Sequence, residues 1–195
     1  MASGLSLLHF RCTSCGNCCK TTVVPLTSAD LRALVSGTGL RPDVLVQWLA
    51  PDEVDMTGEP ETFALLDVGR RLMALRREPE GCSLLDAANQ CSAYAHRPRA
   101  CRAYPLSAEF GRRGGVRRLR LLRGLECDHA TDGRVSVPQL RHDHAALRQE
   151  LAAYALSIAD WNRLQRRRQV LGKRLHGARA LVERMLASGS PSRGM

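Results

Sequence analysis

The stretch Cys12-Thr-Ser-Cys-Gly-Asn-Cys-Cys19 (CTSCGNCC) contains four of the eight cysteines of the chain. Core packing does not explain this density, because cysteine buries as a small hydrophobe and packing favours no such spacing. Metal binding, disulfide formation and redox chemistry remain as explanations. We therefore begin the prediction of fold and function from these residues.

The composition of the chain bears on which explanation applies. The chain has 195 residues, of which 44% are hydrophobic, so it is long enough to form a core without disulfide bonds. No stretch approaches the roughly 20 apolar residues of a membrane span, and the N-terminus lacks the features of a signal peptide. We therefore expect a cytoplasmic protein with no membrane partner. Thiols are kept reduced in that compartment, which favours metal binding or redox chemistry over disulfides.

The spacing within the stretch favours iron–sulfur chemistry. Cys12, Cys15 and Cys18 form a CxxCxxC pattern, which lets one tight loop present three thiolates to a single centre, as in loops that hold four-iron clusters. A zinc site of paired knuckles would show a second CxxC downstream, and this sequence has none. Side chains of adjacent residues such as Cys18 and Cys19 diverge, so we expect these two not to share one metal ion. Cys19 is then a spare or bridging thiol, or the cysteines serve more than one centre.

The other four cysteines are dispersed along the chain, so each must reach a shared centre from a different part of the fold. The candidate metal ligands are Cys12, Cys15, Cys18, Cys19, Cys82, Cys91, Cys101 and Cys127. The favoured cofactor is an iron–sulfur cluster, most simply a 4Fe–4S cluster held by the three loop cysteines and one distant cysteine. The alternative cofactor is zinc, since eight cysteines could also form two four-thiolate sites.

A second cysteine block, from Gly81 to Pro105, reads GCSLLDAANQCSAYAHRPRACRAYP. The segments that carry a family resemblance are CTSCGNCC, Gly81-Cys82, Cys91-Ser-Ala-Tyr94, Arg97-Pro98 and Cys101-Arg102-Ala-Tyr104-Pro105. Over residues 10–130 the chain resembles the YkgJ-like cysteine-cluster family, whose domain is described as zinc- or iron-chelating. The flagellin lysine N-methylases look like relatives, and that resemblance implies an iron–sulfur centre and methyl-transfer chemistry. This chain is shorter and has no glycine loop for a dinucleotide or S-adenosylmethionine.

The histidines are weaker candidates for metal ligands. His9, His96 and His129 could reach a centre that the cysteines frame, because imidazole binds both zinc and iron. His142 and His144 begin a polar helix and are expected to face solvent.

Four residues of the second cysteine block have two competing interpretations. Tyr94, Arg97, Arg102 and Tyr104 could tune the charge of nearby thiolates through hydrogen bonds. Alternatively, they brace the turn between the two prolines that flank Cys101. The sequence does not decide between these roles.

Hydrophobic periodicity and turn signals predict an α+β fold. A capping box at Thr27 should begin a helix that ends near Gly37, and a short helix should follow Pro42. Residues 63–66 and 72–75 should form a hairpin, and residues 116–122 another strand of a small antiparallel sheet. From residue 138 to residue 185 apolar positions recur at helical spacing, which predicts one long helix or two with a break between residues 172 and 177.

The expected architecture is a small cysteine-rich, metal-centred core with a short antiparallel sheet, followed by C-terminal helices. In residue numbers, 1–135 form the cysteine-cluster metal-binding domain and 136–187 a C-terminal helical segment packed on it. Residues 188–195 are expected to be a disordered tail.

The formal charge of +10 raises the question of nucleic-acid binding. Only Lys20 and Lys173 of the 29 basic residues are lysines, and such an arginine bias is typical of a GC-rich genome. No aromatic residue interleaves with the densest basic run, residues 112–123, so no stacking platform is visible. We therefore do not expect nucleic acid as a partner.

Two classes of function fit these observations. In the first, the metal centre serves redox or group (methyl) transfer chemistry on a protein or small-molecule substrate. In the second, structural zinc supports an interaction or nucleic-acid-binding module. Nucleophilic catalysis by one cysteine with His96 as base ranks last, because a segment crowded with ligands is a poor place for a lone nucleophile. The sequence specifies no catalytic residue and no particular substrate.

Overall fold

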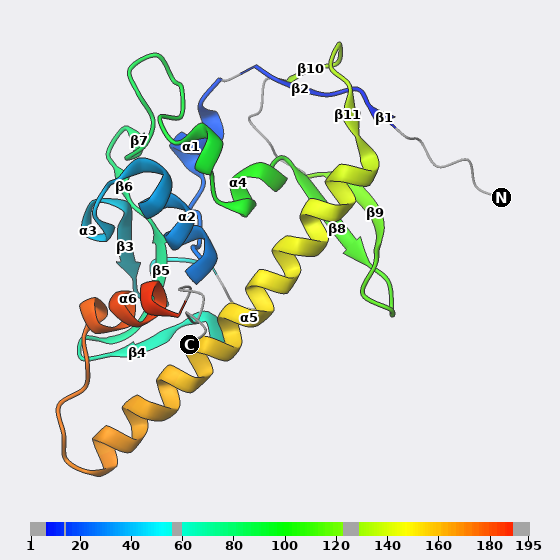
Figure 1. Ribbon diagram of the computed structural model, residues 1–195. Helices are drawn as coiled ribbons and strands as arrows, with labels where there is room; N and C mark the ends of the chain where they lie inside the picture. The colour runs from blue at the N-terminus through cyan, green and yellow to red at the C-terminus, as the bar shows by residue number, and fades with distance from the viewer. Residues whose placement is uncertain (1–6, 14, 56–59, 123–128, 189–195) are drawn as a thin grey trace, which may run out of the picture.

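The computed structural model describes residues 7–13, 15–55, 60–122 and 129–188 (Figure 1). The α-helices are α1 (Asn17–Thr21), α2 (Ser28–Thr38), α3 (Pro42–Leu45), α4 (Arg99–Ala103), α5 (Val137–Val170) and α6 (Ala178–Ala187). Two 3-10 helices are η1 (Pro60–Thr62) and η2 (Tyr94–His96). The strands are β1 (Leu7–Leu8), β2 (Arg11–Cys12), β3 (Val46–Leu49), β4 (Ala64–Leu66), β5 (Gly69–Leu75), β6 (Arg77–Glu78), β7 (Gly81–Cys82), β8 (Leu106–Phe110), β9 (Val116–Leu121), β10 (His129–Ala130) and β11 (Val135–Ser136). Mixed helices and short antiparallel sheets confirm the predicted α+β class.

The largest sheet has three antiparallel strands in the order β3-β5-β4. A hairpin is present where predicted, but its turn is shorter: β4 pairs with residues 69–71 across a two-residue turn, whereas the predicted partner residues 72–75 pair with β3. The predicted strand at residues 116–122 is also present as β9, but it pairs with β8 in a separate hairpin. The three-stranded sheet and the β8–β9 hairpin are therefore distinct (Figure 1).

Helix α2 begins as predicted and ends later than predicted. The Thr27 hydroxyl accepts a hydrogen bond from the Asp30 amide, and the Asp30 carboxylate accepts one from the Thr27 amide, which is a complete capping box. The helix continues through Gly37 and stops at Gly39, whose φ of 69° is left-handed. Gly37 has a packing role instead, because a Cβ there would lie 2.1 Å from the His96 ring.

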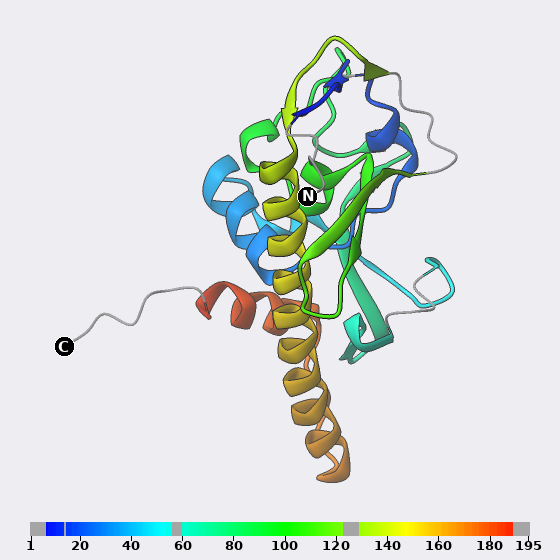
Figure 2. The same ribbon diagram turned by 90° about the vertical axis from the view of Figure 1, so that its right-hand side faces the viewer.

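The C-terminal periodicity corresponds to two helices, with a break in the predicted region. Helix α5 has 34 residues and is capped by Ser136, whose hydroxyl accepts from the Gln139 amide. Helix α6 begins after Gly177. In Figure 2, α5 runs the length of the molecule and α6 folds back from its far end. None of the helices within the described residues combines the length and apolarity needed to cross a membrane.

One hydrophobic core joins the N-terminal and C-terminal parts of the chain. It combines buried residues of α2, the three-stranded sheet, α5 and α6, including Leu34, Met73, Ile158, Trp161 and Met185. The half-buried Cys82 and Cys91 pack against the same cluster. The division at residues 135 and 136 stays a prediction, and apart from Ser188 the predicted tail lies outside the described residues.

Helix α5 also covers the open edge of the sheet with polar side chains. The Trp161 indole N–H donates to the Leu65 carbonyl at 2.8 Å, and the Leu65 amide donates to the Asn162 side chain at 2.6 Å. Gln165 donates to the Leu65 carbonyl at 2.9 Å and to the His176 carbonyl at 2.7 Å. These bonds satisfy backbone groups of an edge strand that would otherwise be unpaired.

Candidate metal centre

Seven cysteines line one cavity of about 710 Å³ at the end of the molecule opposite the tip of α5. They are Cys12, Cys15, Cys18, Cys19, Cys82, Cys91 and Cys101. Cys127, the eighth predicted ligand, lies outside the described residues. The structure thus brings together cysteines that are widely separated in the sequence, and their ligand roles stay predictions.

Within the CTSCGNCC stretch, a strand ends at its first cysteine and a helix begins before its last two cysteines. Cys12 belongs to β2, and Cys18 and Cys19 lie on α1. Gly16 precedes the helix with a left-handed φ of 74°, which redirects the chain between strand and helix. Cys15, next to Gly16, is half-buried, whereas Cys12 is exposed.

The Sγ atoms of Cys18 and Cys19 lie 4.0 Å apart. The prediction that these adjacent side chains diverge is therefore wrong, because both thiols turn toward the same cavity. A hydrogen bond with Cys19 lowers the pKa of Cys18 to about 6, and the same bond raises the pKa of Cys19. Ionising one thiol of the pair therefore favours keeping the other protonated.

Three more thiols from other elements lie within electrostatic reach of this pair. Burial raises the pKa of Cys101 to about 12, and the charges of Cys82 and Cys18 add to this effect. Burial also raises the pKa of Cys82, with a further contribution from Cys91. Ionising one of these thiols therefore disfavours ionising the others.

The donor set of the cavity is rich in sulfur. In the described ranges, no histidine, aspartate or glutamate lines it. Thiolates suit zinc, iron and iron–sulfur clusters, whereas magnesium and calcium prefer oxygen. Across the same described ranges, no three Cys, His, Asp or Glu side chains are already clustered closely enough to hold one metal ion.

Arg77, which the sequence did not identify as a site residue, ties α1 to the second cysteine block. Its guanidinium donates to the carbonyl oxygens of Cys19 at 3.1 Å and Thr22 at 2.8 Å, and also to that of Lys20. Gly81 lies nearby, and a Cβ on it would approach the Cys19 carbonyl to 2.9 Å. This close backbone approach brings Cys82 beside Cys19.

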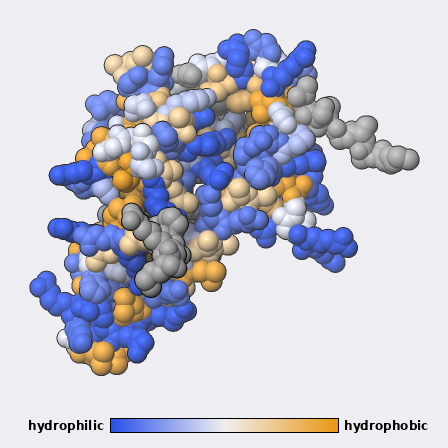
Figure 3. All heavy atoms as spheres, viewed as in Figure 1, coloured by the Kyte–Doolittle hydropathy of each residue, from blue (hydrophilic) through white to orange (hydrophobic). Residues whose placement is uncertain are grey.

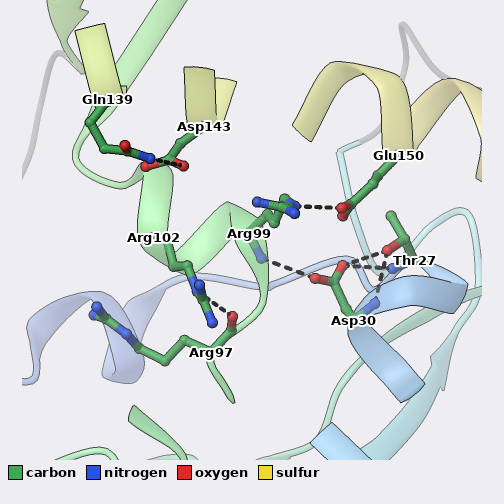
Figure 4. Close-up of polar contacts among 8 residues, drawn as sticks. All are labelled: Thr27, Asp30, Arg97, Arg99, Arg102, Gln139, Asp143 and Glu150. Atoms are coloured by element: carbon green, nitrogen blue, oxygen red, sulfur yellow. Dashed lines mark hydrogen bonds and ion pairs between the residues drawn. The ribbon is translucent and has the colours of Figure 1, made fainter. Parts of the chain in front are cut away.

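The position of Cys101 depends on contacts to α2 and α5. The amide of Arg99, in the first turn of α4, donates to Asp30 at 3.0 Å, and the Arg99 guanidinium pairs with Glu150 (Figure 4). Asp30 is only 4% exposed and also forms the capping box with Thr27. Helix α4, which carries Cys101, is therefore held from both sides.

Both Arg97 and Arg102 donate to backbone carbonyls of the turn, and Arg97 does so to the Tyr94 carbonyl at 3.3 Å. Arg102 braces the turn, because its guanidinium donates to the carbonyls of Arg97 at 3.0 Å and Ala95 at 2.7 Å. The Arg97 guanidinium stacks 3.7 Å from the centre of the Tyr94 ring. Its positive charge favours the thiolate forms of Cys18 and Cys101.

The histidines lie away from the cavity wall within the described residues. His9 and His142 are exposed, and His96 is half-buried. His144 is 5% exposed, so the prediction that it faces solvent is wrong. Burial lowers its pKa, and its Nε2 has no hydrogen-bond partner among the described residues. The His129 side chain lies outside the described residues.

Comparison with known families gives one match. A model of the family described as "CxxCxxCC: Putative zinc- or iron-chelating domain" matches residues 11–116. The match covers more than half of the chain and contains all seven cysteines of the cavity, whereas Cys127 lies beyond it. No curated protein and no solved structure matches the chain.

Proposed function

The chain belongs to the CxxCxxCC family, and we propose that its cysteine cavity holds an iron–sulfur cluster used in redox or methyl-transfer chemistry. The observation that carries this proposal is that seven cysteines from four separate parts of the sequence line one cavity. The methyl-transfer part rests on the resemblance to the flagellin lysine N-methylases. We expect this chemistry in the cytoplasm, where thiols stay reduced.

The electrostatics of the cavity support a bound cation. Ionising several of these half-buried thiols together is unfavourable, because the charge of one thiolate raises the pKa of its neighbours. A metal removes this conflict, since its charge stabilises thiolates outright. This electrostatic conflict favours a role for the thiols as metal ligands over a role as independent nucleophiles.

The size and walls of the cavity support a cluster rather than a single ion. About 710 Å³ is far more space than one ion needs. The wall includes Val24, Leu75, Leu84, Leu106 and Leu140, and such an apolar surrounding limits water near a cluster and tunes its reduction potential. A cluster of this kind exchanges single electrons when it is bound.

A 4Fe–4S cluster held by Cys12, Cys15, Cys18 and one distant cysteine remains our proposed ligand arrangement. We favour Cys101 as the distant ligand. Its helix α4 is anchored through Arg99, and the charge of Cys18 contributes to the raised pKa of Cys101, which supports a shared centre for the two thiols.

Structural zinc is the second candidate, and one distance favours it. Four sulfurs at about 2.3 Å from zinc in a tetrahedron lie about 3.8 Å from one another. The 4.0 Å between Cys18 and Cys19 is close to that value, so both could bind one zinc ion. This arrangement would support an interaction module rather than redox chemistry.

Anaerobic purification followed by metal analysis separates the two candidates. An iron–sulfur protein should be brown, contain iron and acid-labile sulfide in equal amounts, and lose visible absorbance with dithionite. Zinc is d¹⁰ and gives no visible absorbance. Colourless protein with stoichiometric zinc and no sulfide would contradict the iron–sulfur proposal.

A further inference from the structure

The end of α5 and the following linker form a projecting element, residues 163–174, which we call the α5 tip. Figures 1 and 2 both show it extending beyond the rest of the molecule. The tip is held in place at its base, because the buried Gln165 accepts from the His176 amide at 3.0 Å and donates to its carbonyl. Across the linker, the Arg168 guanidinium donates to the Arg174 carbonyl at 2.8 Å.

The α5 tip carries much of the positive charge of the chain. It has six basic and no acidic residues, against a net charge of +10 for the whole chain. Its basic residues are Arg163, Arg166, Arg167, Arg168, Lys173 and Arg174. Arg163 pairs with Asp160, and the other five form no ion pair with any residue that the structure describes. The tip is therefore a concentrated cationic surface.

Two adjacent aliphatic residues lie at the extremity of this cationic surface. Val170 is 87% exposed and Leu171 is 67% exposed. Figure 3 shows an apolar patch at this lower end of the molecule with hydrophilic surface around it. Single exposed apolar residues are common on protein surfaces and need no explanation. Here, however, two exposed aliphatic residues lie among basic residues on a projecting element, and surfaces that bind lipid interfaces combine apolar and basic residues in this way.

We propose that the α5 tip docks on an anionic lipid bilayer, with Val170 and Leu171 entering the headgroup region and Arg166, Arg167 and Lys173 contacting lipid phosphates. Anionic surfaces attract basic segments, and the buried aliphatic groups add a contribution that salt does not screen. Nucleic acid is a less suitable ligand for the tip. The tip has no aromatic side chain on which a base could stack, and exposed aliphatic side chains contribute little binding free energy next to phosphate groups.

The expectation of no membrane partner rested on the length of apolar runs, which tests for membrane-spanning helices and not for surface docking. The inference also stands apart from the metal proposal. Leu140, on the cavity wall, lies 30 residues before Val170 on the same helix. Docking would therefore hold the cavity roughly 45 Å from the bilayer along the axis of α5.

Vesicle co-sedimentation of the full chain, as purified with its metal, tests the proposal. The chain should partition onto vesicles of equal parts phosphatidylglycerol and phosphatidylcholine, and much less onto phosphatidylcholine alone. The double variant Val170→Ser/Leu171→Ser should lower partition about tenfold through lost apolar burial. The double variant Arg166→Ser/Arg167→Ser should lower it about tenfold through lost charge.

The matched control is Arg112→Ser/Arg113→Ser, which removes the same charge from the exposed β8–β9 turn, away from the tip. It should change partition by less than about twofold, because screening limits distant charges. If the control lowered partition as much as Arg166→Ser/Arg167→Ser does, binding would depend on the net charge of the chain and not on the α5 tip, and the proposal would be wrong. If Val170→Ser/Leu171→Ser bound the vesicles as well as the unsubstituted chain does, the proposal that these two residues enter the headgroup region would be wrong.

Tryptophan fluorescence gives an independent measure of insertion. In Leu171→Trp, emission should shift to shorter wavelength on addition of anionic vesicles and stay unchanged with duplex DNA. The unsubstituted chain, which contains Trp48 and Trp161, supplies the background. A shift with DNA and none with vesicles would overturn the proposal and assign the tip to nucleic acid.

Discussion

Cys101 lies on α4, a helix that Arg99 anchors to two other helices. Asp30 accepts from the Arg99 amide and Glu150 pairs with the Arg99 side chain, so α4 presents Cys101 to the cavity from a fixed position. Metal bound by such a residue contributes to the free energy of folding, because the unfolded chain has no preformed site.

We expect Cys101→Ser to lose most of its bound metal and to melt at a lower temperature than the unsubstituted protein. Metal analysis of the purified variant and circular-dichroism melting measure both effects. Ala87→Ser, in the exposed loop of the same cysteine block, is the control and should keep both properties. Unchanged metal content in Cys101→Ser would remove Cys101 from the proposed ligands.

His144 provides a pH dependence that does not involve the cavity thiols directly. Because burial lowers its pKa in the folded state, the unfolded chain binds the proton more readily than the folded chain. The stability due to neutral His144 is therefore fully present above about pH 6.5 and is lost as pH falls toward its folded pKa.

Replacing His144 with leucine should make the melting temperature less dependent on pH below about pH 6.5. Melting curves at a series of pH values measure this change. His142→Leu, at an exposed position on the same helix, should keep the pH dependence of the unsubstituted protein. Equal pH profiles for His144→Leu and the unsubstituted protein would show that His144 is not the responsible group.

At the scale of elements, the junction between α5 and β4 depends on Gln165. This side chain is fully buried and bonds to the Leu65 carbonyl and to both backbone groups of His176. Its loss would leave buried backbone groups without partners, and each such group costs about 1–3 kcal/mol.

We expect Gln165→Ala to lower the free energy of unfolding by about 2–4 kcal/mol in urea titration. Gln169→Ala, one turn later at an exposed position of α5, should change it by less than about 0.5 kcal/mol. A loss in Gln165→Ala no larger than in Gln169→Ala would mean that solvent satisfies these groups as well as Gln165 does.

Elements specified by neighbouring residues were predictable from the sequence. The capping box at Thr27, the β4–β5 hairpin and the break near Gly177 each depend on residues close together in the chain. The contacts of Gln165 and Asn162 with β4 were not predictable, because they join residues about 100 positions apart. No local pattern distinguishes these two polar side chains from others on a long helix.

The candidate site also has features that were predictable from the sequence and features that were not. The cysteines were identifiable because their density has no packing explanation, and they line one cavity. The convergence of Cys18 and Cys19 was missed, since side-chain rotamers rather than helical periodicity set the separation of their sulfurs. Arg77 carried no signal at all, because its role depends on carbonyls more than 50 positions away.

At the scale of the whole molecule, the net charge of +10 predicts weak and non-specific attraction to nucleic acid. Binding to duplex DNA should be insensitive to sequence and nearly gone by about 200 mM salt, as counterion release requires. Fluorescence anisotropy with two unrelated duplexes across a salt series measures both properties. Selective binding that persists at that salt concentration would favour a nucleic-acid-binding module.

The central claim is that the cysteine cavity is a thiolate-ligated metal centre, and X-ray absorption at the edge of the bound metal tests it most directly. The method reports the atoms next to the metal whether that metal is iron or zinc. We predict that sulfur alone surrounds the metal, at about 2.3 Å. Nitrogen or oxygen neighbours at about 2.0–2.1 Å would contradict the claim, because the metal would then be bound by histidines or carboxylates outside the described wall of the cavity.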